Sequence, residues 1–247
     1  MDLKPIWSDH YRINWYEADA HNCASLVTIC NFLQVTAFRH AHNLGFDYTN
    51  KAGFDRLWVL IRMLIHMDKY PAWNEEIEVK TWHRGSEGLI AMRDYEINDS
   101  QGKRLGAVSS NWFLLDPETR KAVAPEINEK AELSSWPVAV MKDKPGRILI
   151  HQDLPLINTI KAGYTDLDMY LHVNNARYID WILNLFPEEM HMNFNISSFL
   201  IEFLSEVRYA EEIKLFASID TKESLVKGVR VGDDKTIFKA KVKWKAR

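Results

Sequence analysis

The sequence has few of the features that mark secreted, membrane or nucleic-acid-binding proteins. Cys23 and Cys30 are the only cysteines in 247 residues, which excludes a disulfide framework and a four-cysteine zinc site. No apolar run approaches the length of a membrane-spanning helix, and the first ten residues lack the apolar core of a signal peptide. The net charge of −3 gives no reason to expect nucleic acid as a partner. We therefore expect a cytoplasmic protein.

Apolar and aromatic side chains, in contrast, are plentiful. Hydrophobic residues make up 47% of the chain, which contains nine Trp, nine Tyr and eleven Phe. This composition indicates a folded chain rather than a disordered one. The length allows one large domain or two of about 120 residues, each with its own core.

One stretch, residues 166–181, combines two carboxylates, a histidine and the start of a helical pattern. Apolar residues recur there at steps of three and four, and an Asn-Asn pair fits the N-cap of the helix. His172 precedes this helix and follows Asp168 by four residues. An imidazole can activate water, a carboxylate can orient it, and the unpaired N–H groups of a first helical turn can bind an oxyanion. The stretch therefore contains the components of acyl chemistry.

The first half of the chain contains a related stretch. A strand predicted over residues 11–15 leads into a loop that contains Asp19, and a long helical pattern follows. When Asp19 is aligned with Asp168, Cys23 stands opposite His172. The Asp–His pair is thus missing from the first half, and we expect only the second half to carry the chemistry.

A series of strands follows each of these stretches. Alternation of polar and apolar residues predicts most of them, and an apolar pattern on both faces predicts a covered strand at 57–67. The ordered series indicates two copies of one α+β unit, a long helix wrapped by an antiparallel sheet. The strands are predicted at 57–67, 76–83, 89–97 and 103–115 in the first half and at 199–208, 212–219, 224–231 and 236–244 in the second.

A segment rich in proline and charge separates the two copies. We interpret it as a linker that runs over the surface, with a short helix within 127–133. The predicted organisation is an N-terminal domain at 1–125, a linker at 126–153 and a C-terminal domain at 154–247.

The string Asp-Leu-Asp-x-x-x-His-Val-Asn-Asn-x-x-Tyr-Ile-x-Trp at residues 166–181 resembles the signature of the acyl-acyl-carrier-protein (acyl-ACP) thioesterases. The resemblance covers nearly the whole chain and implies an α+β fold of two tandem hotdog domains. It implies hydrolysis of fatty acyl-ACP to free fatty acid in fatty acid biosynthesis, without a metal or cofactor. The implied partner is the carrier protein with its phosphopantetheine-linked acyl chain. The chain itself is expected to be a monomer or a homodimer.

The resemblance also implies roles for individual residues. His172 matches the catalytic histidine of the family and is expected to act as general base toward water. Asp168 matches a catalytic aspartate that orients the imidazole or contacts the thioester. Glu206, which its apolar neighbours place in a strand, matches a glutamate that holds the attacking water. Backbone N–H groups at the helix start are expected to bind the oxyanion, namely those of Val173 and Asn174.

Two positions depart from the family pattern. Tyr170 stands where the family usually has Asn, so either its hydroxyl or a neighbouring amide replaces the Asn, or activity is lost. The second outcome would leave a non-catalytic acyl-binding protein. Val207 stands where plant relatives have Cys, which excludes a cysteine nucleophile at that position. An acyl-CoA thioesterase of the same fold is a further alternative.

The resemblance places the acyl chain in the first domain. Trp58, Leu60 and Met63 are candidates to line its site, although each also fits an ordinary core position. Basic residues are candidates to meet an acidic carrier protein, although each also fits a solvated surface; they are Arg84, Lys142, Lys144 and Arg147.

Overall fold

The structure is a computed structural model that describes residues 3–45, 57–116, 118–124 and 135–247. The chain divides into two compact units, Met1–Pro145 and Gly146–Arg247. The division falls within the linker predicted at 126–153. The short helix predicted at 127–133 lies outside the described residues.

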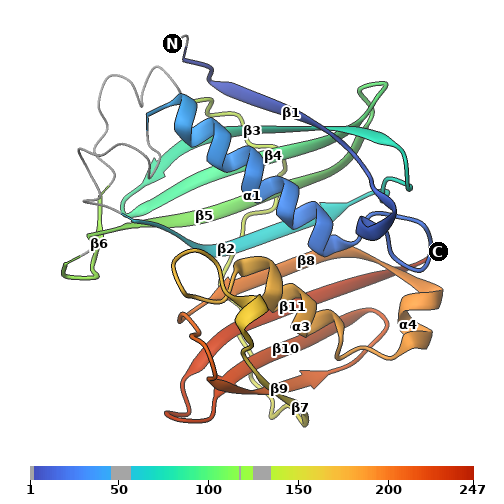
Figure 1. Ribbon diagram of the computed structural model, residues 1–247, viewed down its shortest axis with the longest axis vertical. Helices are drawn as coiled ribbons and strands as arrows, with labels where there is room; N and C mark the ends of the chain where they lie inside the picture. Colours follow the sequence, from blue (N-terminus) through green and yellow to red (C-terminus); the bar gives the residue numbers. More distant parts are fainter. Residues whose placement is uncertain (1–2, 46–56, 117, 125–134) are drawn as a thin grey trace. The chain divides into compact units, whose positions relative to one another are not determined.

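The first unit is an antiparallel sheet with one long helix lying across it (Figure 1). Helix α1 (Leu26–Asn43) begins after Ser25, whose side chain accepts a hydrogen bond from the Thr28 N–H and so caps the helix. The sheet order is β1-β3-β4-β5-β2, and β6 pairs with β5. The strands are β1 (Ile6–Arg12), β2 (Leu57–Met67), β3 (Glu76–Glu87), β4 (Ile90–Asp99), β5 (Arg104–Leu115) and β6 (Ala122–Val123).

The second unit repeats this plan. Its sheet order is β7-β9-β10-β11-β8, which is again first, third, fourth, fifth and second strand in chain order. Helix α3 (Asn175–Leu183) lies across this sheet (Figure 1), and α4 (Glu188–Asn193) follows. The predicted duplication of an α+β unit is therefore confirmed. The strands are β7 (Leu156–Lys161), β8 (Phe194–Phe203), β9 (Glu212–Ser218), β10 (Glu223–Arg230) and β11 (Thr236–Ala246).

Two predicted strands are displaced in the structure. The first strand, predicted at 11–15, ends at Arg12 and begins earlier, at Ile6, and residues Trp15–Glu17 form a 3-10 helix, η1. The strand predicted at 199–208 ends at Phe203. The N–H groups of Leu204 and Ser205 both donate to the carbonyl of Ile237, so the backbone leaves the regular ladder there. Glu206 consequently lies in the connection between β8 and β9, not in a strand.

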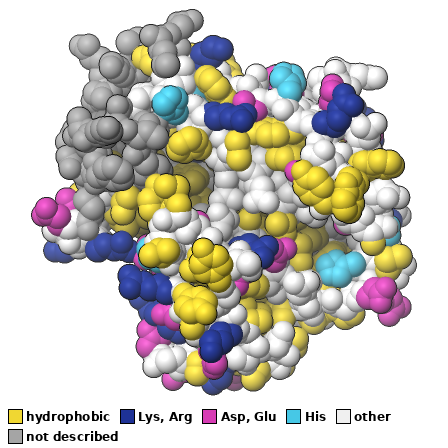
Figure 2. All heavy atoms as spheres, viewed as in Figure 1, with side chains coloured by type: hydrophobic (Ala, Val, Ile, Leu, Met, Phe, Trp, Pro, Cys, Tyr) yellow, Lys and Arg dark blue, Asp and Glu magenta, His cyan; other side chains and the backbone are white. Residues whose placement is uncertain are grey.

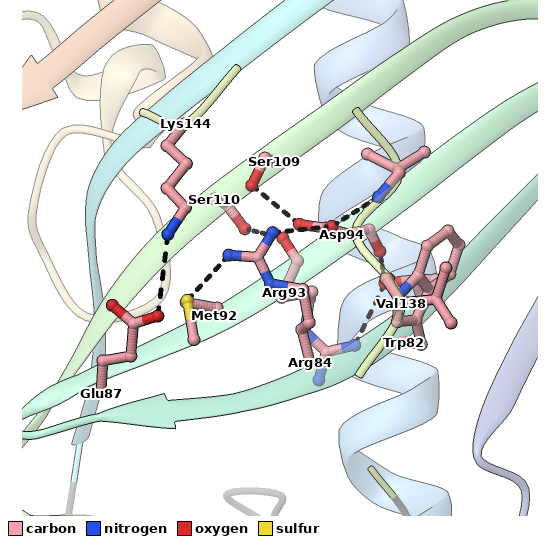
Figure 3. A network of polar contacts seen from close by, with 12 residues as sticks. Trp82, Arg84, Glu87, Met92, Arg93, Asp94, Ser109, Ser110, Val138 and Lys144 are labelled. Carbon is pink, nitrogen blue, oxygen red and sulfur yellow. Dashed lines mark hydrogen bonds and ion pairs between the residues drawn. The ribbon is translucent and has the colours of Figure 1, made fainter. Parts of the chain in front are cut away.

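A buried carboxylate fixes residues 135–145 against the first sheet (Figure 3). Asp94 is fully buried and accepts hydrogen bonds from Ser109 Oγ at 2.7 Å and from the Val140 N–H at 2.9 Å. Arg84 Nη1 lies 3.2 Å from the same carboxylate, and its side chain is 8% exposed. The suggestion that Arg84 meets a carrier protein is therefore wrong, because its guanidinium is buried in an ion pair with Asp94.

Two neutral histidines, His40 of α1 and His83 of β3, lie between α1 and the first sheet. His40 Nδ1 lies 2.9 Å from Arg93 Nη1, and His40 Nε2 lies 2.9 Å from the Lys4 carbonyl. Since a guanidinium only donates, Nδ1 accepts and Nε2 donates, which requires a neutral ring. Burial, aided by Arg93, lowers the pKa of His40 to about 3 and that of His83 to about 4. Among the described residues, no helix is long and apolar enough to cross a membrane.

Candidate active site

The loop that leads into α3 is built around the Asp168 carboxylate. Its Oδ1 accepts hydrogen bonds from the N–H of Tyr170 at 2.8 Å and from the N–H of His172 at 3.4 Å. The Asp168 N–H donates in turn to the His172 carbonyl at 2.8 Å. Leu171 closes this turn with a φ of 63°, a conformation that costs a residue with a Cβ some strain. These bonds fix the backbone of His172.

His172 and Glu206 meet at this loop. The imidazole Nε2 lies 3.3 Å from Glu206 Oε2, and the two side chains are 22% and 36% exposed. A β-bridge between His172 and Arg208, with a bond from the Val173 N–H to the Val207 carbonyl at 2.9 Å, brings the two segments together. The pair is therefore held by backbone bonds on both sides, yet it stays open to a substrate.

The structure assigns different partners to the two carboxylates than the prediction did. The imidazole of His172 lies against Glu206, whereas the hydrogen bonds of Asp168 go to the backbone N–H groups of its own turn. Asp168 thus orients the histidine through the main chain. Asp166, at the end of the 3-10 helix η2 (Tyr164–Asp166), is ion-paired with Arg177 at 3.2 Å.

The predicted oxyanion donors are already bonded, which corrects that prediction. The Val173 N–H donates to the Val207 carbonyl, and the Asn174 N–H donates to the Asp166 carbonyl, each at 2.9 Å. Asn174 is the N-cap of α3 and accepts from the Ala176 N–H. The N–H of Asn175, the first residue of α3, has no acceptor among the described residues. This is the donor that the start of the helix leaves open.

Tyr170 lies in the same loop with its side chain at the surface. The residue is 40% exposed, and its N–H is bonded to Asp168. Partial burial and the nearby Asp168 carboxylate raise the pKa of the phenol above its ordinary value, so the hydroxyl is a hydrogen-bond donor at neutral pH.

The first unit contains the same loop without the acid–base pair. Asp19 Oδ1 accepts from the N–H groups of His21 at 2.8 Å and Cys23 at 3.1 Å, and Asn22 has a φ of 57°. Cys23 bridges to Ala72 as His172 does to Arg208. The structure thus pairs Cys23 with His172, as the sequence alignment does. By the same pairing, Tyr70 occupies the position of Glu206.

The three predicted acyl-site residues share one face of the first sheet. On β2, Leu60 pairs with Trp112 and Met63 pairs with Ser110, because a bulge at Ile61 shifts the register between them. Without that extra residue Met63 would point to the opposite face. Trp58 lies two residues before Leu60 and points the same way. Ser110 is also the partner of Arg93, so this is the face that α1 covers.

Two units that each wrap an antiparallel sheet about a helix make this chain a two-domain hotdog protein, with the His172–Glu206 contact in its second domain. Comparison with known families narrows the class. The family model for the acyl-ACP thioesterase N-terminal domain matches residues 4–131, and that for the C-terminal domain matches residues 151–246. The chain belongs to the acyl-ACP thioesterase family.

Individual relatives show the same relationship. The chain is 28% identical to a chloroplastic acyl-[acyl-carrier-protein] hydrolase of Cuphea viscosissima, over 98% of this chain and 63% of that protein. It is 31% identical to a chloroplastic palmitoyl-acyl carrier protein thioesterase of Arabidopsis thaliana, over 81% of this chain and 52% of that protein. The chain thus spans about half to two thirds of these relatives.

Solved structures agree with the fold. An acyl-ACP thioesterase from Bacteroides thetaiotaomicron is 26% identical, with a TM-score of 0.90 and 98% of each chain covered. A 12:0-ACP thioesterase from Umbellularia californica, 21% identical with a TM-score of 0.87, has the same fold over 98% of each chain.

Proposed function

We propose that this protein hydrolyses the thioester of a fatty acyl chain on acyl carrier protein and releases the free fatty acid. The observation that carries the proposal is the His172–Glu206 contact of 3.3 Å, in the loop that bears the family string. A histidine held by a carboxylate is a general base that works near neutral pH.

In the proposed mechanism the Nε2–H of His172 donates to Glu206, which leaves the lone pair of Nδ1 to accept a proton from water. The resulting hydroxide attacks the thioester carbonyl, and the Asn175 N–H stabilises the oxyanion of the tetrahedral intermediate. The C–S bond then breaks. The imidazolium returns its proton to the departing pantetheine thiolate, and Glu206 stabilises the imidazolium between the two steps.

Asp168 and Tyr170 have supporting roles in this proposal. Asp168 holds the turn that presents His172. The Tyr170 hydroxyl replaces the amide donor of the usual Asn, from a longer stem. The alternative of a non-catalytic acyl-binding protein predicts no turnover in the wild type and recovery of activity in Tyr170→Asn.

We place the acyl chain on the α1-covered face of the first unit, near Trp58, Leu60 and Met63. The shared face of these residues supports this placement, since an extended apolar ligand needs a continuous apolar lining. In the second unit, exposed apolar side chains of the site loop suit the approach of such a substrate; Met169 is 83% exposed and Leu171 is 70% exposed. Figure 2 shows hydrophobic side chains gathered over the loops that lead into α1 and α3.

An acidic carrier protein is the proposed partner because the second sheet presents a basic face. Lys227 on β10 stands opposite Lys239 on β11, and directly opposed residues of an antiparallel pair share a face. The alternating pattern of β11 and the pairing of β9 with β10 add further lysines to this basic face. Its five lysines are Lys214, Lys227, Lys239, Lys241 and Lys243. Glutamates also share this face, since Glu223 is ion-paired with Lys241 and Lys243 and Glu202 stands opposite Lys239, but the lysines outnumber them.

The five equivalent positions of the first sheet carry no lysine, although Lys80 and Arg62 lie on the same face of that sheet. The two sheets can be aligned by their strand registers. The cross-strand pair Ile213–Arg230 of the second sheet then corresponds to the pair Ile77–Asp99 of the first sheet. On this alignment two lysines of the basic face are replaced by glutamates and three by uncharged residues. The equivalents are Glu78, Glu96, Ala107, Ser109 and Asn111. Since the two sheets share one plan, the basic face is a property of the second unit that the fold alone does not require.

Two further features belong to this proposal. We place the protein in the cytoplasm, which the scarcity of cysteine supports. The plant relatives, in contrast, are chloroplastic. We place the reaction in fatty acid biosynthesis, as monomer or homodimer, because free fatty acid is the product of acyl-ACP hydrolysis.

The test is a panel of acyl-ACP and acyl-CoA substrates of equal chain length, assayed with the wild type, Tyr170→Asn and Lys227→Glu. We expect turnover of acyl-ACP, and a lower kcat/KM on acyl-ACP but not on acyl-CoA in Lys227→Glu, with the difference shrinking at high salt. Lys235→Glu, a reversal in an exposed turn outside the basic face, is the control. A clear preference for acyl-CoA would overturn the carrier as partner.

A further inference from the structure

Arg230, the last residue of β10, contacts the connection between β8 and β9 that contains Glu206. Its Nη2 donates to the Glu206 carbonyl at 2.5 Å and to Ser205 Oγ at 3.4 Å. Its Nε lies 3.2 Å from Glu211 Oε2 and its Nη1 lies 3.2 Å from Asp233 Oδ2. The side chain is 19% exposed. Its bonds to the Glu206 carbonyl and Ser205 are part-buried and charge-assisted, whereas the Nε–Glu211 contact lacks hydrogen-bond geometry and Asp233 is 47% exposed.

This connection needs support because it lies outside the sheet ladder. β8 ends at Phe203, and Glu206 follows within a few residues. Glu211, on the C-terminal side of Glu206, accepts a hydrogen bond from the Arg208 N–H at 3.0 Å and is ion-paired with Arg230. Arg230 also bonds Ser205 on the N-terminal side, so it contacts the chain on both sides of Glu206. The contact of 3.3 Å between the Glu206 carboxylate and the His172 imidazole therefore depends on where this backbone lies.

The equivalent connection of the first unit, which has no counterpart of the His172–Glu206 pair, shows which contacts the turn requires for folding alone. Glu75 accepts from the Ala72 N–H at 2.9 Å, as Glu211 accepts from the Arg208 N–H, so the turn itself is retained in both units. The register equivalent of Arg230 is Asp99, which caps its own hairpin by accepting from the N–H groups of Gln101 and Lys103. The turn therefore forms in the first unit without an arginine at this position. Arg230 occurs in the second unit, which is the unit that contains Glu206.

We propose that Arg230 is a positioning residue that holds Glu206 against His172. The inference rests on the proposed hydrolysis, because it gives Arg230 a role in that reaction. It acts through the backbone of residue 206 and does not touch the substrate. Its guanidinium is suited to this task because it is a rigid fork that reaches several acceptors at once, which an ammonium group does not.

The test compares Arg230→Gln and Arg230→Lys with the wild type in acyl-ACP hydrolysis. We expect Arg230→Gln to lower kcat by about 10- to 100-fold with KM nearly unchanged, the usual cost of a misplaced catalytic group. Arg230→Lys should recover part of this loss. Asp233→Asn removes one anchor of the guanidinium and should have a smaller effect in the same direction. Lys235→Gln, which removes a nearby exposed charge, is the matched control and should retain wild-type kcat.

A double-mutant cycle separates positioning from general stability. In the Glu206→Gln background, Arg230→Gln should cost little further kcat, because the group that it positions is already gone. Fully additive losses would overturn the inference. So would a lower melting temperature accompanied by unchanged kcat at a temperature where the variant is folded.

A readout that needs no turnover distinguishes this inference from the proposed function. The NMR signals of the His172 ring should move in Arg230→Gln in the same direction as in Glu206→Gln, because both variants remove the carboxylate from Nε2. If the wild type hydrolyses no acyl-ACP but the ring signals move in this way, the proposed function fails and the positioning role stands. Unchanged ring signals in Arg230→Gln would overturn the positioning role.

Discussion

In the first unit the loop before α1 folds around Asp19, and in the second unit the loop before α3 folds around Asp168. Each aspartate accepts hydrogen bonds from the N–H groups two and four residues later, and each loop bridges to the connection that precedes the third strand of its sheet. The frame, meaning this loop and the connection that it bridges to, is shared by both units. Its two equivalent positions hold Cys23 and Tyr70 in the first unit and His172 and Glu206 in the second.

The comparison separates the frame from the chemistry. Because Asp19 builds the same turn with Cys23, not histidine, four residues later, the turn bonds of Asp168 are explained by the fold alone. The acid–base pair of the second unit depends on two side chains at positions where the frame accepts other residues. Arg230 is a third difference between the units, and it acts on one of those two side chains.

The largest effect on stability is expected where the two sheet faces differ most. Asp94 of the first sheet is a buried carboxylate, and its register equivalent in the second sheet is Leu225. Asp94→Ala leaves the Arg84 guanidinium buried without its partner, so the free energy of unfolding should fall by about 3–5 kcal/mol. Urea unfolding followed by tryptophan fluorescence measures this loss. A loss below about 1 kcal/mol, or an equal loss in Leu225→Ala, would contradict the difference between the faces.

Glu206→Gln tests the pair itself. The amide no longer stabilises an imidazolium, so kcat/KM on acyl-ACP should fall by about 100- to 1,000-fold. Tyr70→Phe, the matched change in the first unit, should leave kcat/KM within about twofold of the wild type. Equal effects of the two changes would mean that the units do not differ in chemistry.

Asp168 and Asp19 can be compared by removing and by neutralising each carboxylate. Alanine at either position removes two charge-assisted bonds to the backbone and should cost about 1–3 kcal/mol of stability. Only Asp168→Ala should also lose activity. Asp168→Asn keeps the Oδ1 acceptor and should retain activity within about tenfold of the wild type. Asp168→Asn as inactive as Asp168→Ala would show that the charge of Asp168 takes part directly.

The smallest effect at neutral pH is a pH dependence that belongs to the first unit and grows as the solution is acidified. His40 and His83 are held neutral, with pKa values of about 3 and about 4 in the folded protein. The unfolded chain binds these protons near pH 6.5, so their contribution is complete above that pH and is lost as the pH falls toward 4. The slope is at most about 1.4 kcal/mol per pH unit for each histidine. Stability curves of His40→Gln should be flatter between pH 6.5 and 4 than those of the wild type or of the exposed-site control His10→Gln.

Much of the fold was predictable because apolar periodicity and turn residues carry it. The duplication followed from aligning Asp19 with Asp168, and most strand positions followed from alternation. The end of β8 was not predictable in this way. Residues 204–208 continue a strand-like pattern, but two successive N–H groups share the Ile237 carbonyl, and only the pairing partner reveals this.

Candidate site residues could be proposed from the sequence, but the contacts between them could not. The family string at residues 166–181 pointed to His172 and Asp168, and the wider family resemblance pointed to Glu206. Which carboxylate meets the imidazole depends on the fold of the loop. The bonds of the Val173 and Asn174 N–H groups to carbonyls depend on the same fold. Arg230 was missed because it lies in β10, far from the family string. An alignment of the strand registers of the two units, which places Arg230 at the position of Asp99, would have drawn attention to it.

The central claim is that one acid–base pair, in the second unit alone, performs the hydrolysis. The most direct measurement is the time course of fatty acid release from acyl-ACP by the wild type, His172→Ala and Cys23→Ala. We predict release by the wild type, an equal rate in Cys23→Ala and a rate lower by about 1,000-fold or more in His172→Ala. Release that survives in His172→Ala, or that is lost in Cys23→Ala, would contradict the account.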